Sequence, residues 1–296
     1  MKTLKCLKGD FENSKLDRKP FGFHHTMSNH PALSIESLSL ILQELPKEKV
    51  MFSKGLNDLN VNFDDALNHD TKKLNLNEMI ETIRTGNGYI AARNLEMHHA
   101  FRGLYEDLLE DIGELLKLNK TGTKALEPMV WLFIASPNAV TPFHFDRSSN
   151  FIFQIRGSKE LAVFPPRVEE IISAKDTESY IDWASDLPPW REELDKHAHK
   201  FNFKAGEAVH IPFVSGHYVK NGPEDISITM SIFFHSKETK RWSDAMKFNN
   251  RLRRFGVKPN VVGETPLKDR LKAGFFPAMN GAFVVVKKIL ILFMLT

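Results

Sequence analysis

From residue 130 onward, the sequence is a succession of short strand-like runs. These runs are rich in β-branched and aromatic residues, which favour strands over helices. They cover residues 130–135, 150–156, 160–164, 201–203, 208–212, 217–220 and 226–235. Turns containing glycine separate several of them, at residues 156–158, 204–206 and 221–223. Many short strands joined by tight turns predict an antiparallel sandwich or barrel.

Helical patterns flank these strands on both sides. Ser34 precedes apolar residues at helical spacing that end at Pro46, and the pair Asn75 and Glu78 is placed like a capping box before a second helix over 76–85. A strand over 89–94 and a long amphipathic helix over 98–117 follow, and another helix is predicted over 238–255. An insert over 168–200, partly helical, interrupts the strands.

We therefore expect three parts. Residues 1–125 form an N-terminal helical elaboration with a strand near 89–94, residues 126–236 form the β core, and residues 237–296 form a C-terminal helix and an apolar tail. Residues 1–33 read as irregular, and their three histidines are expected on the surface or in loops rather than around a metal: His24, His25 and His30.

Composition narrows the class of protein. A chain of 296 residues that is 42% hydrophobic can bury a sizeable core, and its single cysteine, Cys6, fits a reducing compartment. The formal charge of +3, with acids and bases interspersed, gives no indication of a nucleic-acid partner. The basic run Arg251–Arg254 is interpreted as a solvated or carboxylate-paired helix end. Charges interrupt every apolar run at the N-terminus, so we expect no secretory signal and a cytoplasmic protein.

The last 16 residues, 281–296, are apolar except for two lysines. A membrane-spanning helix needs about 20 apolar residues, so we expect no stable membrane insertion. Three alternatives stay open for this tail: a buried terminal strand, a helix packed on a partner subunit, and a peripheral membrane contact.

His144 and Asp146 lie two residues apart in a strand-like stretch, so both side chains project from the same face. His217, at the end of a further strand-like segment, is the natural third ligand. Two histidines and one carboxylate on one face of an octahedral ion are typical of non-haem Fe(II) oxygenases. The competitors for the third position are His210, His235 and the pair His197 and His199.

Lys159 lies 15 residues after His144, just past a glycine turn, among apolar residues. A lysine in such a strand is costly to bury unless it is paired, and the distal carboxylate of a dicarboxylate cosubstrate such as 2-oxoglutarate supplies a partner. Alternatively, Lys159 faces solvent on an edge strand. Thr141 and Asn150 flank the predicted ligands, where they either contact the cosubstrate, support the ligands, or only stabilise turns.

These motifs carry a resemblance. Thr141-Pro-x-His-x-Asp146, Asn150-Phe151, Gln154-Ile-x-Gly-x-Lys159 and Phe164-Pro-Pro166 resemble the cupin-like, JmjC-related 2-oxoglutarate oxygenases, which include the asparaginyl hydroxylase that inhibits hypoxia-inducible factor. A longer match, over roughly residues 20–275, is similar to bacterial cupin-like proteins without an assigned substrate. It includes Phe21-Gly-Phe-His-His25, Asn29-His-Pro31, Gly206–Pro212, Asn221-Gly-Pro223 and Asn250–Arg254.

The resemblance implies a double-stranded β-helix, or jelly roll, in which His144, Asp146 and His217 bind Fe(II) and Lys159 binds the distal carboxylate of 2-oxoglutarate. It also implies that Thr141 and Tyr89 contact the same cosubstrate and that Asn150 lies near the metal. Two departures stand out: Ser231 occupies the place of an asparagine near the cosubstrate, and Ser215-Gly216 replaces an aromatic pair before His217, which predicts a more open metal mouth.

The expected function is hydroxylation, dependent on Fe(II), 2-oxoglutarate and dioxygen, of an unidentified protein or small-molecule substrate. The alternative is a non-catalytic cupin-like module that binds metal or regulates a partner. A homodimer through the C-terminal helix is expected, because relatives pair in this way and the apolar tail would gain from burial.

Overall fold

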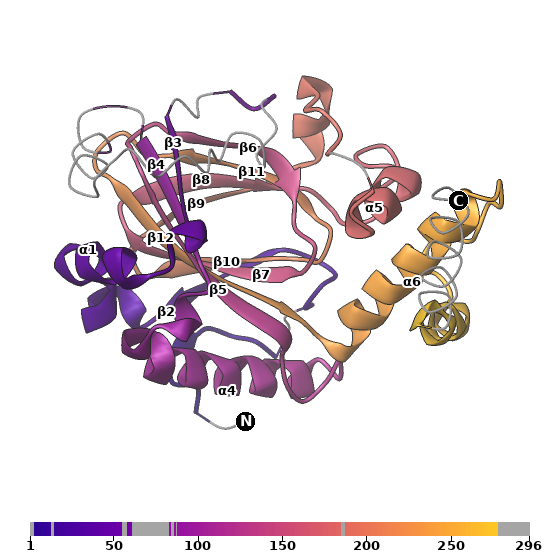
Figure 1. Cartoon of the computed structure of the whole chain (residues 1–296), viewed down its shortest axis with the longest axis horizontal. Coiled ribbons are helices and arrows are strands. Elements are labelled where there is room, and N and C mark those ends of the chain that lie inside the picture. Colours follow the sequence, from indigo (N-terminus) through magenta and orange to yellow (C-terminus); the bar gives the residue numbers. More distant parts are fainter. Residues whose placement is uncertain are drawn as a thin grey trace, which may run out of the picture.

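The computed structural model describes residues 3–12, 15–54, 58–60, 83, 86, 88–184 and 187–277. Two antiparallel sheets face each other, and helices lie below and beside them (Figure 1). The strands are β1 (Leu7–Lys8), β2 (Phe21–His25), β3 (Val50–Lys54), β4 (Gly88–Arg93), β5 (Leu126–Ala135), β6 (Val140–Phe145), β7 (Ser149–Arg156), β8 (Ser158–Val163), β9 (His199–Lys204), β10 (Glu207–Ile211), β11 (Gly216–Asn221) and β12 (Ser227–His235).

The α-helices are α1 (Ile35–Glu44), α4 (Arg102–Leu118), α5 (Ala174–Ile181) and α6 (Lys237–Arg253), and residues 266–277 are also helical. Short 3₁₀ turns are η1 (Met27–Asn29), η2 (Pro31–Leu33), η3 (Lys47–Lys49), η5 (Leu95–Met97), η6 (His99–Phe101) and η7 (Glu192–His197). None of the described helices is long and apolar enough to cross a bilayer.

The larger sheet has the strand order β1-β2-β10-β7-β12-β5-β4-β3, and the smaller sheet has the order β6-β11-β8-β9. Strands adjacent along the chain thus alternate between the two sheets from β5 to β8, which is the winding of a jelly roll. The predicted fold class, mainly β with a double-stranded β-helix, is confirmed. Strands β1 to β4 extend the larger sheet, and the division of the chain at residue 125 stays a prediction.

Period-two alternation separates the two faces of the larger sheet. On β12, Ile228, Met230 and Ile232 are fully buried in a cluster with leucines of α1 and α4, such as Leu38 and Leu108. The intervening Ser231 and Phe233 point the other way, into a cavity between the sheets. The outer face therefore supplies the core, and the inner face lines a site.

The main helices lie where the sequence predicts them. The Ser34 hydroxyl caps α1 by accepting the Ser37 N–H, and β4 covers the predicted strand. Helix α4 begins four residues later than expected because residues 99–101 form a 3₁₀ turn. The predicted helix over 76–85 with its capping box, and the apolar tail over 281–296, lie outside the described residues, apart from Ile83.

The expectation that residues 1–33 are irregular is wrong. Strand β2 pairs with β10 in the larger sheet, and His25 is buried there, with its Nε2 3.0 Å from the Gln154 carbonyl oxygen. Gly22, the second residue of this five-residue strand, hides its pattern, and the pairing with β10 stabilises it.

The basic run at the end of α6 is a carboxylate-paired face, as predicted. Arg253 pairs with Glu178 at 2.5 Å, and Arg251 and Arg254 approach Asp182 at 3.7 and 3.5 Å. These pairs hold α6 against α5.

Asp17 ties the N-terminal segment to the strands that carry the site. Its Oδ1 accepts hydrogen bonds from the Ser149 hydroxyl at 2.6 Å and the Phe213 N–H at 3.0 Å, and all three groups are buried. We expect Asp17→Ala to lower the free energy of unfolding by about 2–4 kcal/mol, because two buried donors lose their acceptor. Chemical denaturation measures this change. Asp225→Ala, which breaks an exposed pair with Arg156, is the control and should cost no more than about 1 kcal/mol.

Candidate functional site

His144, Asp146 and His217 converge at the edge of the smaller sheet. His144 lies in β6, Asp146 directly follows that strand, and His217 lies at the start of β11, where it is the cross-strand partner of His144. One ligand atom from each residue lies within 4.8 Å of the others. The structure therefore brings the three predicted ligands together.

Backbone carbonyls orient both imidazoles. His144 Nδ1 lies 2.8 Å from the Pro142 carbonyl oxygen, and His217 Nδ1 lies 3.0 Å from the Ser215 carbonyl oxygen. A carbonyl only accepts, so each Nδ1 carries the proton and donates. Each Nε2 is then left with its lone pair directed toward Asp146, which is the tautomer that a metal ion requires.

The donor set fits a divalent ion. His144 Nε2 and His217 Nε2 lie 4.0 and 3.7 Å from the Asp146 carboxylate oxygens, while neighbouring donors at metal–ligand distances of ~2.1 Å lie about 3 Å apart. A movement of about 1 Å would close the site around an ion. Asn150 Nδ2 donates to Asp146 Oδ2 at 3.3 Å and holds the carboxylate from β7.

Burial shapes the electrostatics of these ligands. It lowers the pKa of His217 well below its usual value, and the neighbouring His144 lowers it further, so His217 is neutral at neutral pH. Burial raises the pKa of the Asp146 carboxyl, while His144 and the hydrogen bond from Asn150 favour its charged form. A divalent cation would relieve the cost of burying this carboxylate.

Gly216 permits a close contact beside the ligands. A Cβ at this position would lie 2.8 Å from the Phe143 ring, which is shorter than real Cβ contacts. Phe143 is itself 4% exposed. Phe143 from β6 therefore packs against Gly216 outside the cavity lining, and the more open mouth expected from Ser215-Gly216 stays a prediction.

A cavity of about 510 Å³ extends from the ligands between the two sheets. Every predicted site residue lines it: Tyr89, Thr141, His144, Asp146, Asn150, Lys159 and His217. The Tyr89 hydroxyl lies 3.3 Å from Thr141 Oγ1, and burial raises the pKa of Tyr89 so that its phenol stays protonated. The metal ligands and the predicted cosubstrate contacts thus share one space.

Lys159 is 5% exposed and points into this cavity from β8. Within the described part of the chain, its ammonium has no hydrogen bond and no ion pair. Burial lowers the pKa of Lys159 to about 7. The alternative of a solvent-facing lysine on an edge strand is wrong, because β8 lies between β11 and β9.

The other candidate histidines have structural roles. His210 is fully buried, where its Nε2 accepts the Asp17 N–H at 3.0 Å and its Nδ1 faces the Asn150 carbonyl oxygen at 3.2 Å. His235 Nδ1 lies 3.2 Å from the Thr239 hydroxyl, and His197 lies near Glu170 at the surface. His199, the remaining candidate, is exposed on β9, and none of the four lines the cavity.

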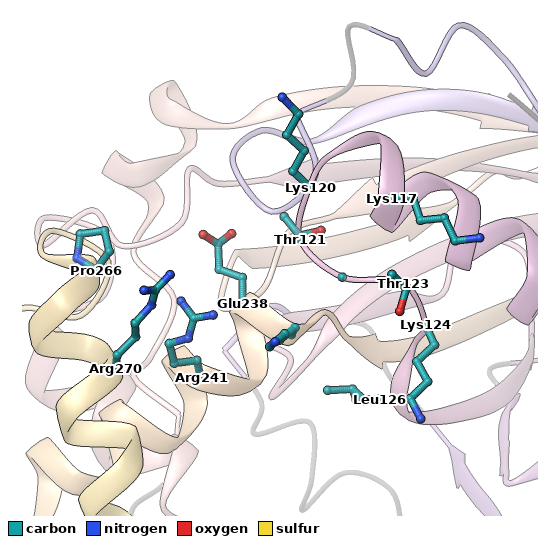
Figure 2. A pocket seen from close by; sticks show the side chains of 12 residues that line it. Lys117, Lys120, Thr121, Thr123, Lys124, Leu126, Glu238, Arg241, Pro266 and Arg270 are labelled. Carbon is teal, nitrogen blue, oxygen red and sulfur yellow. The ribbon is translucent and has the colours of Figure 1, made fainter.

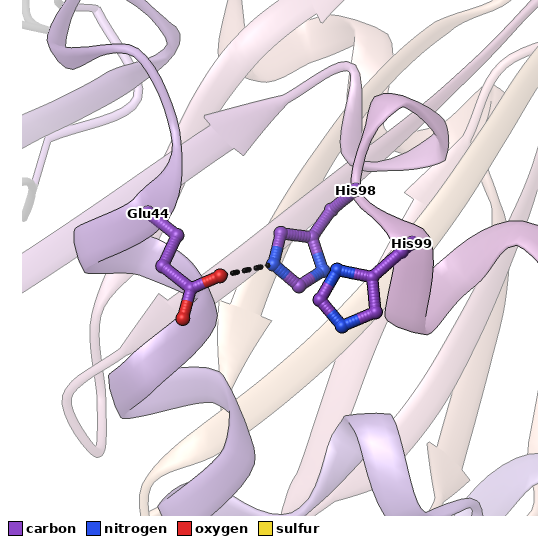
Figure 3. Close-up of side chains that lie close together, drawn as sticks. All are labelled: Glu44, His98 and His99. Carbon is purple, nitrogen blue, oxygen red and sulfur yellow. Dashed lines mark hydrogen bonds and ion pairs between the residues drawn. The ribbon is translucent and has the colours of Figure 1, made fainter.

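A second group of potential ligands, Glu44, His98 and His99, lies outside the cavity (Figure 3). His98 Nδ1 accepts the Ala100 N–H at 3.2 Å, so its Nε2 carries the proton and donates to Glu44 at 2.9 Å. Both nitrogens of His98 are therefore engaged, and this group caps η6 rather than forming a metal site.

A larger concavity, of about 870 Å³, shares no lining residue with the first (Figure 2). Lysines and arginines line it between the end of α4 and the start of α6, among them Lys120, Lys124 and Arg241. Its one carboxylate, Glu238, is bound by Arg18. It contains no pair of potential metal ligands, so its chemistry differs from that of the cavity between the sheets.

Several cavity residues were missed from the sequence. Arg147, next to Asp146, has its guanidinium carbon 3.6 and 3.4 Å from the ring centroids of Tyr180 and Trp183, which belong to the insert. Arg93 on β4 and Trp131 on β5 line the same cavity. Arg93 and Trp131 point into the cavity because they alternate along their strands with residues that are buried on the other face. Only the pairing of β4 with β5 shows that both residues belong to this site.

Comparison with known protein families shows which family this chain belongs to. Residues 11–240 match the family model of the cupin-like domain, so the chain belongs to the cupin-like domain family. No curated protein matches it significantly.

Solved structures provide distant likenesses. An X-ray structure of Escherichia coli YcfD is 13% identical with a TM-score of 0.46, and the match covers 87% of this chain and 60% of that one. YcfD, described as a ribosomal oxygenase, is also similar in its complex with cobalt and 2-oxoglutarate (12% identity, TM-score 0.43, 87% and 59% covered). Bacillus subtilis oxalate decarboxylase is 18% identical with a TM-score of 0.28, over 54% and 29%. This chain thus spans about three-fifths of the length of YcfD.

Proposed function

We propose that this protein is an Fe(II)- and 2-oxoglutarate-dependent dioxygenase that hydroxylates a substrate held in the cavity between the sheets. The observation that carries the proposal is the pairing of two features in one cavity. The triad of His144, Asp146 and His217 offers ligands on one side, and the buried Lys159, which has no partner among the described residues, offers a cation on the other. Membership of the cupin-like domain family supports it.

A buried lysine without a partner is unfavourable, and a metal centre alone does not explain it. In the smaller sheet, Lys159 pairs with Asn221, whereas His217 lies four residues back along β11 and pairs with Val163. At about 3.3 Å per residue, the cation and the metal ligands are separated by roughly 13 Å along the strands. Their side chains converge into the cavity, so a short dicarboxylate can contact the metal at one end and Lys159 at the other.

The bound Fe(II) would activate O2, with one oxygen atom entering succinate as 2-oxoglutarate loses CO2 and the other entering a substrate C–H bond. The chain's own residues bind and orient these reactants. His144, Asp146 and His217 hold the ion, and Asn150 fixes the carboxylate of Asp146. Lys159, with Tyr89 and Thr141 beside the same space, holds the distal carboxylate, and the apolar walls exclude water.

Turnover of the cosubstrate tests the proposal. Protein loaded with Fe(II) should convert 2-oxoglutarate to succinate and CO2 in equal amounts, slowly without substrate, and only when O2 is present. Succinate formation no greater than that of His217→Ala would contradict the proposed function.

Binding of 2-oxoglutarate should take up about one proton above pH 7. Lys159, with a pKa of about 7, is largely neutral at pH 8.5 in the free protein, and the bound carboxylate restores its charge. Below pH 6 the lysine is already charged, so uptake should vanish. Calorimetry of the Mn(II)-loaded protein in two buffers of different ionisation enthalpy measures the uptake. Lys159→Met should show none, and equal uptake at both pH values would contradict this role.

A further inference from the structure

Within the described part of the chain, three neighbouring residues on the cavity floor each have a buried polar atom without a hydrogen-bond partner. Arg93 on β4 pairs across the strands with Trp131 on β5, which pairs in turn with Ser231 on β12. The atoms are Arg93 Nε, Trp131 Nε1 and Ser231 Oγ, and all three residues line the 510 Å³ cavity. Because buried polar groups are nearly always satisfied, three such atoms in one row of residues that line one cavity indicate that these side chains adjust to a ligand there.

All three polar atoms of the row are able to donate a hydrogen bond. The arginine and indole nitrogens only donate, and a serine hydroxyl is able to donate as well. Arg93 also donates to the Glu48 carbonyl at 3.3 Å, but it forms no ion pair with a carboxylate in the described part of the chain. Among the described residues that line the cavity, Asp146 is the sole carboxylate, and it belongs to the predicted metal site. A ligand for this row must therefore bring acceptors, and a cationic group would meet repulsion.

The row of Arg93, Trp131 and Ser231 begins near the predicted metal ligands and leads away from them. Ser231 is two residues from Phe233, the cross-strand partner of Asn150, and Asn150 bonds to Asp146. Arg93 lies two strands further away, about 10 Å from Ser231. The row thus runs from the metal ligands toward the edge of the larger sheet. It leaves the space beside Lys159, Tyr89 and Thr141 to the cosubstrate.

Flat apolar side chains flank the row. The Trp131 ring lies 5.8 Å from the rings of both Phe133 and Phe233, measured between centroids. Met129 and Met51 complete this wall of the cavity. An apolar body therefore fits between the metal ligands and Arg93.

We infer that Arg93, Trp131 and Ser231 bind the substrate, and that the substrate is an apolar, preferably aromatic, carboxylate whose acid group lies at Arg93. This inference rests on the proposed function, since it assigns to the substrate the part of the cavity that the cosubstrate leaves. The carboxylate accepts from Arg93 and Trp131, and the carbon that reacts lies toward His144 and His217.

Three probes of one shape and different charge test the inference: phenylacetate, phenylacetamide and phenethylamine. Their dissociation constants are measured by ligand-observed NMR on the Zn(II)-loaded protein with saturating 2-oxoglutarate, so that Lys159 is occupied. We expect phenylacetate to bind about tenfold more tightly than phenethylamine, with the amide between them. Arg93→Met should weaken phenylacetate about tenfold and remove the preference, and Trp131→Phe, which keeps a ring but removes the N–H, should weaken it about threefold.

The control is Arg102→Met, an exposed arginine outside the cavity, which should bind all three probes like the parent protein. Equal affinity for acid and amine in the parent protein, or an undiminished preference in Arg93→Met, would overturn the inference.

The same experiment distinguishes failure of the proposed function from failure of the proposed substrate class. If 2-oxoglutarate does not bind, the probes are measured on Lys159→Met, which removes the competing cation. A preference for the carboxylate that persists there and depends on Arg93 supports the row without the cosubstrate. Cosubstrate binding without any charge preference refutes only the substrate class.

Discussion

His217→Ala is expected to lose the metal and all turnover. The imidazole is one of three donors, and its loss leaves a buried carboxylate and one histidine to hold the ion. Removing a group that only supports a metal ligand already costs 10–100-fold in affinity, so we expect at least about a hundredfold weaker metal binding here. Metal content after dialysis and the rate of succinate formation measure the two effects.

The matched control is His24→Ala, because His24 is exposed and lies outside the cavity. It should keep both metal and turnover. Metal retained at parental affinity by His217→Ala would refute the assigned ligand set, and His210, the remaining buried histidine near Asn150, would then need to be tested.

Lys159→Met is expected to separate cosubstrate binding from metal binding. It preserves the length and apolar character of the side chain but removes the cation. Loss of one partner of a buried ion pair costs about 3–5 kcal/mol, so the affinity for 2-oxoglutarate should fall by roughly 100–4,000-fold while metal content stays the same. Titration of the Mn(II)-loaded protein measures the change. Lys204→Met, an exposed lysine on the neighbouring β9, should bind like the parent protein.

The same variant should stabilise the ligand-free protein. Burial lowers the pKa of Lys159 to about 7 from an unfolded value of 10.5, so between these values the unfolded chain binds a proton that the folded chain does not. The penalty is complete below pH 7 and disappears as the pH rises toward 10.5. At pH 8, Lys159→Met should therefore raise the free energy of unfolding by about 3 kcal/mol. A lysine that is destabilising where it stands is expected at a binding site rather than in a core.

Local patterns were sufficient to predict most of the fold. Helix α1 follows Ser34 and a regular apolar stripe, and α6 follows Ser236 with a capping box to Thr239. The three predicted glycine turns separate β7 from β8, β9 from β10 and β11 from β12, whereas β6 is absent from the predicted strand runs. Strand β2 was missed, because five residues that include a glycine carry little local signal and pairing with β10 supplies the stability.

The predicted ligands could be grouped because His144 and Asp146 are close in sequence, although His217 lies at the start of β11 rather than, as predicted, at the end of the preceding strand. Long-range register brings His217 opposite His144, and it also aligns Arg93, Trp131 and Ser231 across three strands. Register of this kind depends on how the sheets wind, so no local spacing in the sequence reveals the polar row. The same holds for His210, whose alternation with apolar neighbours resembles that of a ligand but whose partner, Asp17, lies 193 residues away.

The anaerobic visible spectrum of the purified protein with Fe(II), before and after addition of 2-oxoglutarate, tests the central claim most directly. Chelation of the iron by the cosubstrate produces a metal-to-ligand charge-transfer band. We predict that the band appears in the parent protein and is absent in Asp146→Ala. If iron binds to the parent protein but no band appears, the cosubstrate does not reach the metal, and the account of this cavity as a dioxygenase site is contradicted.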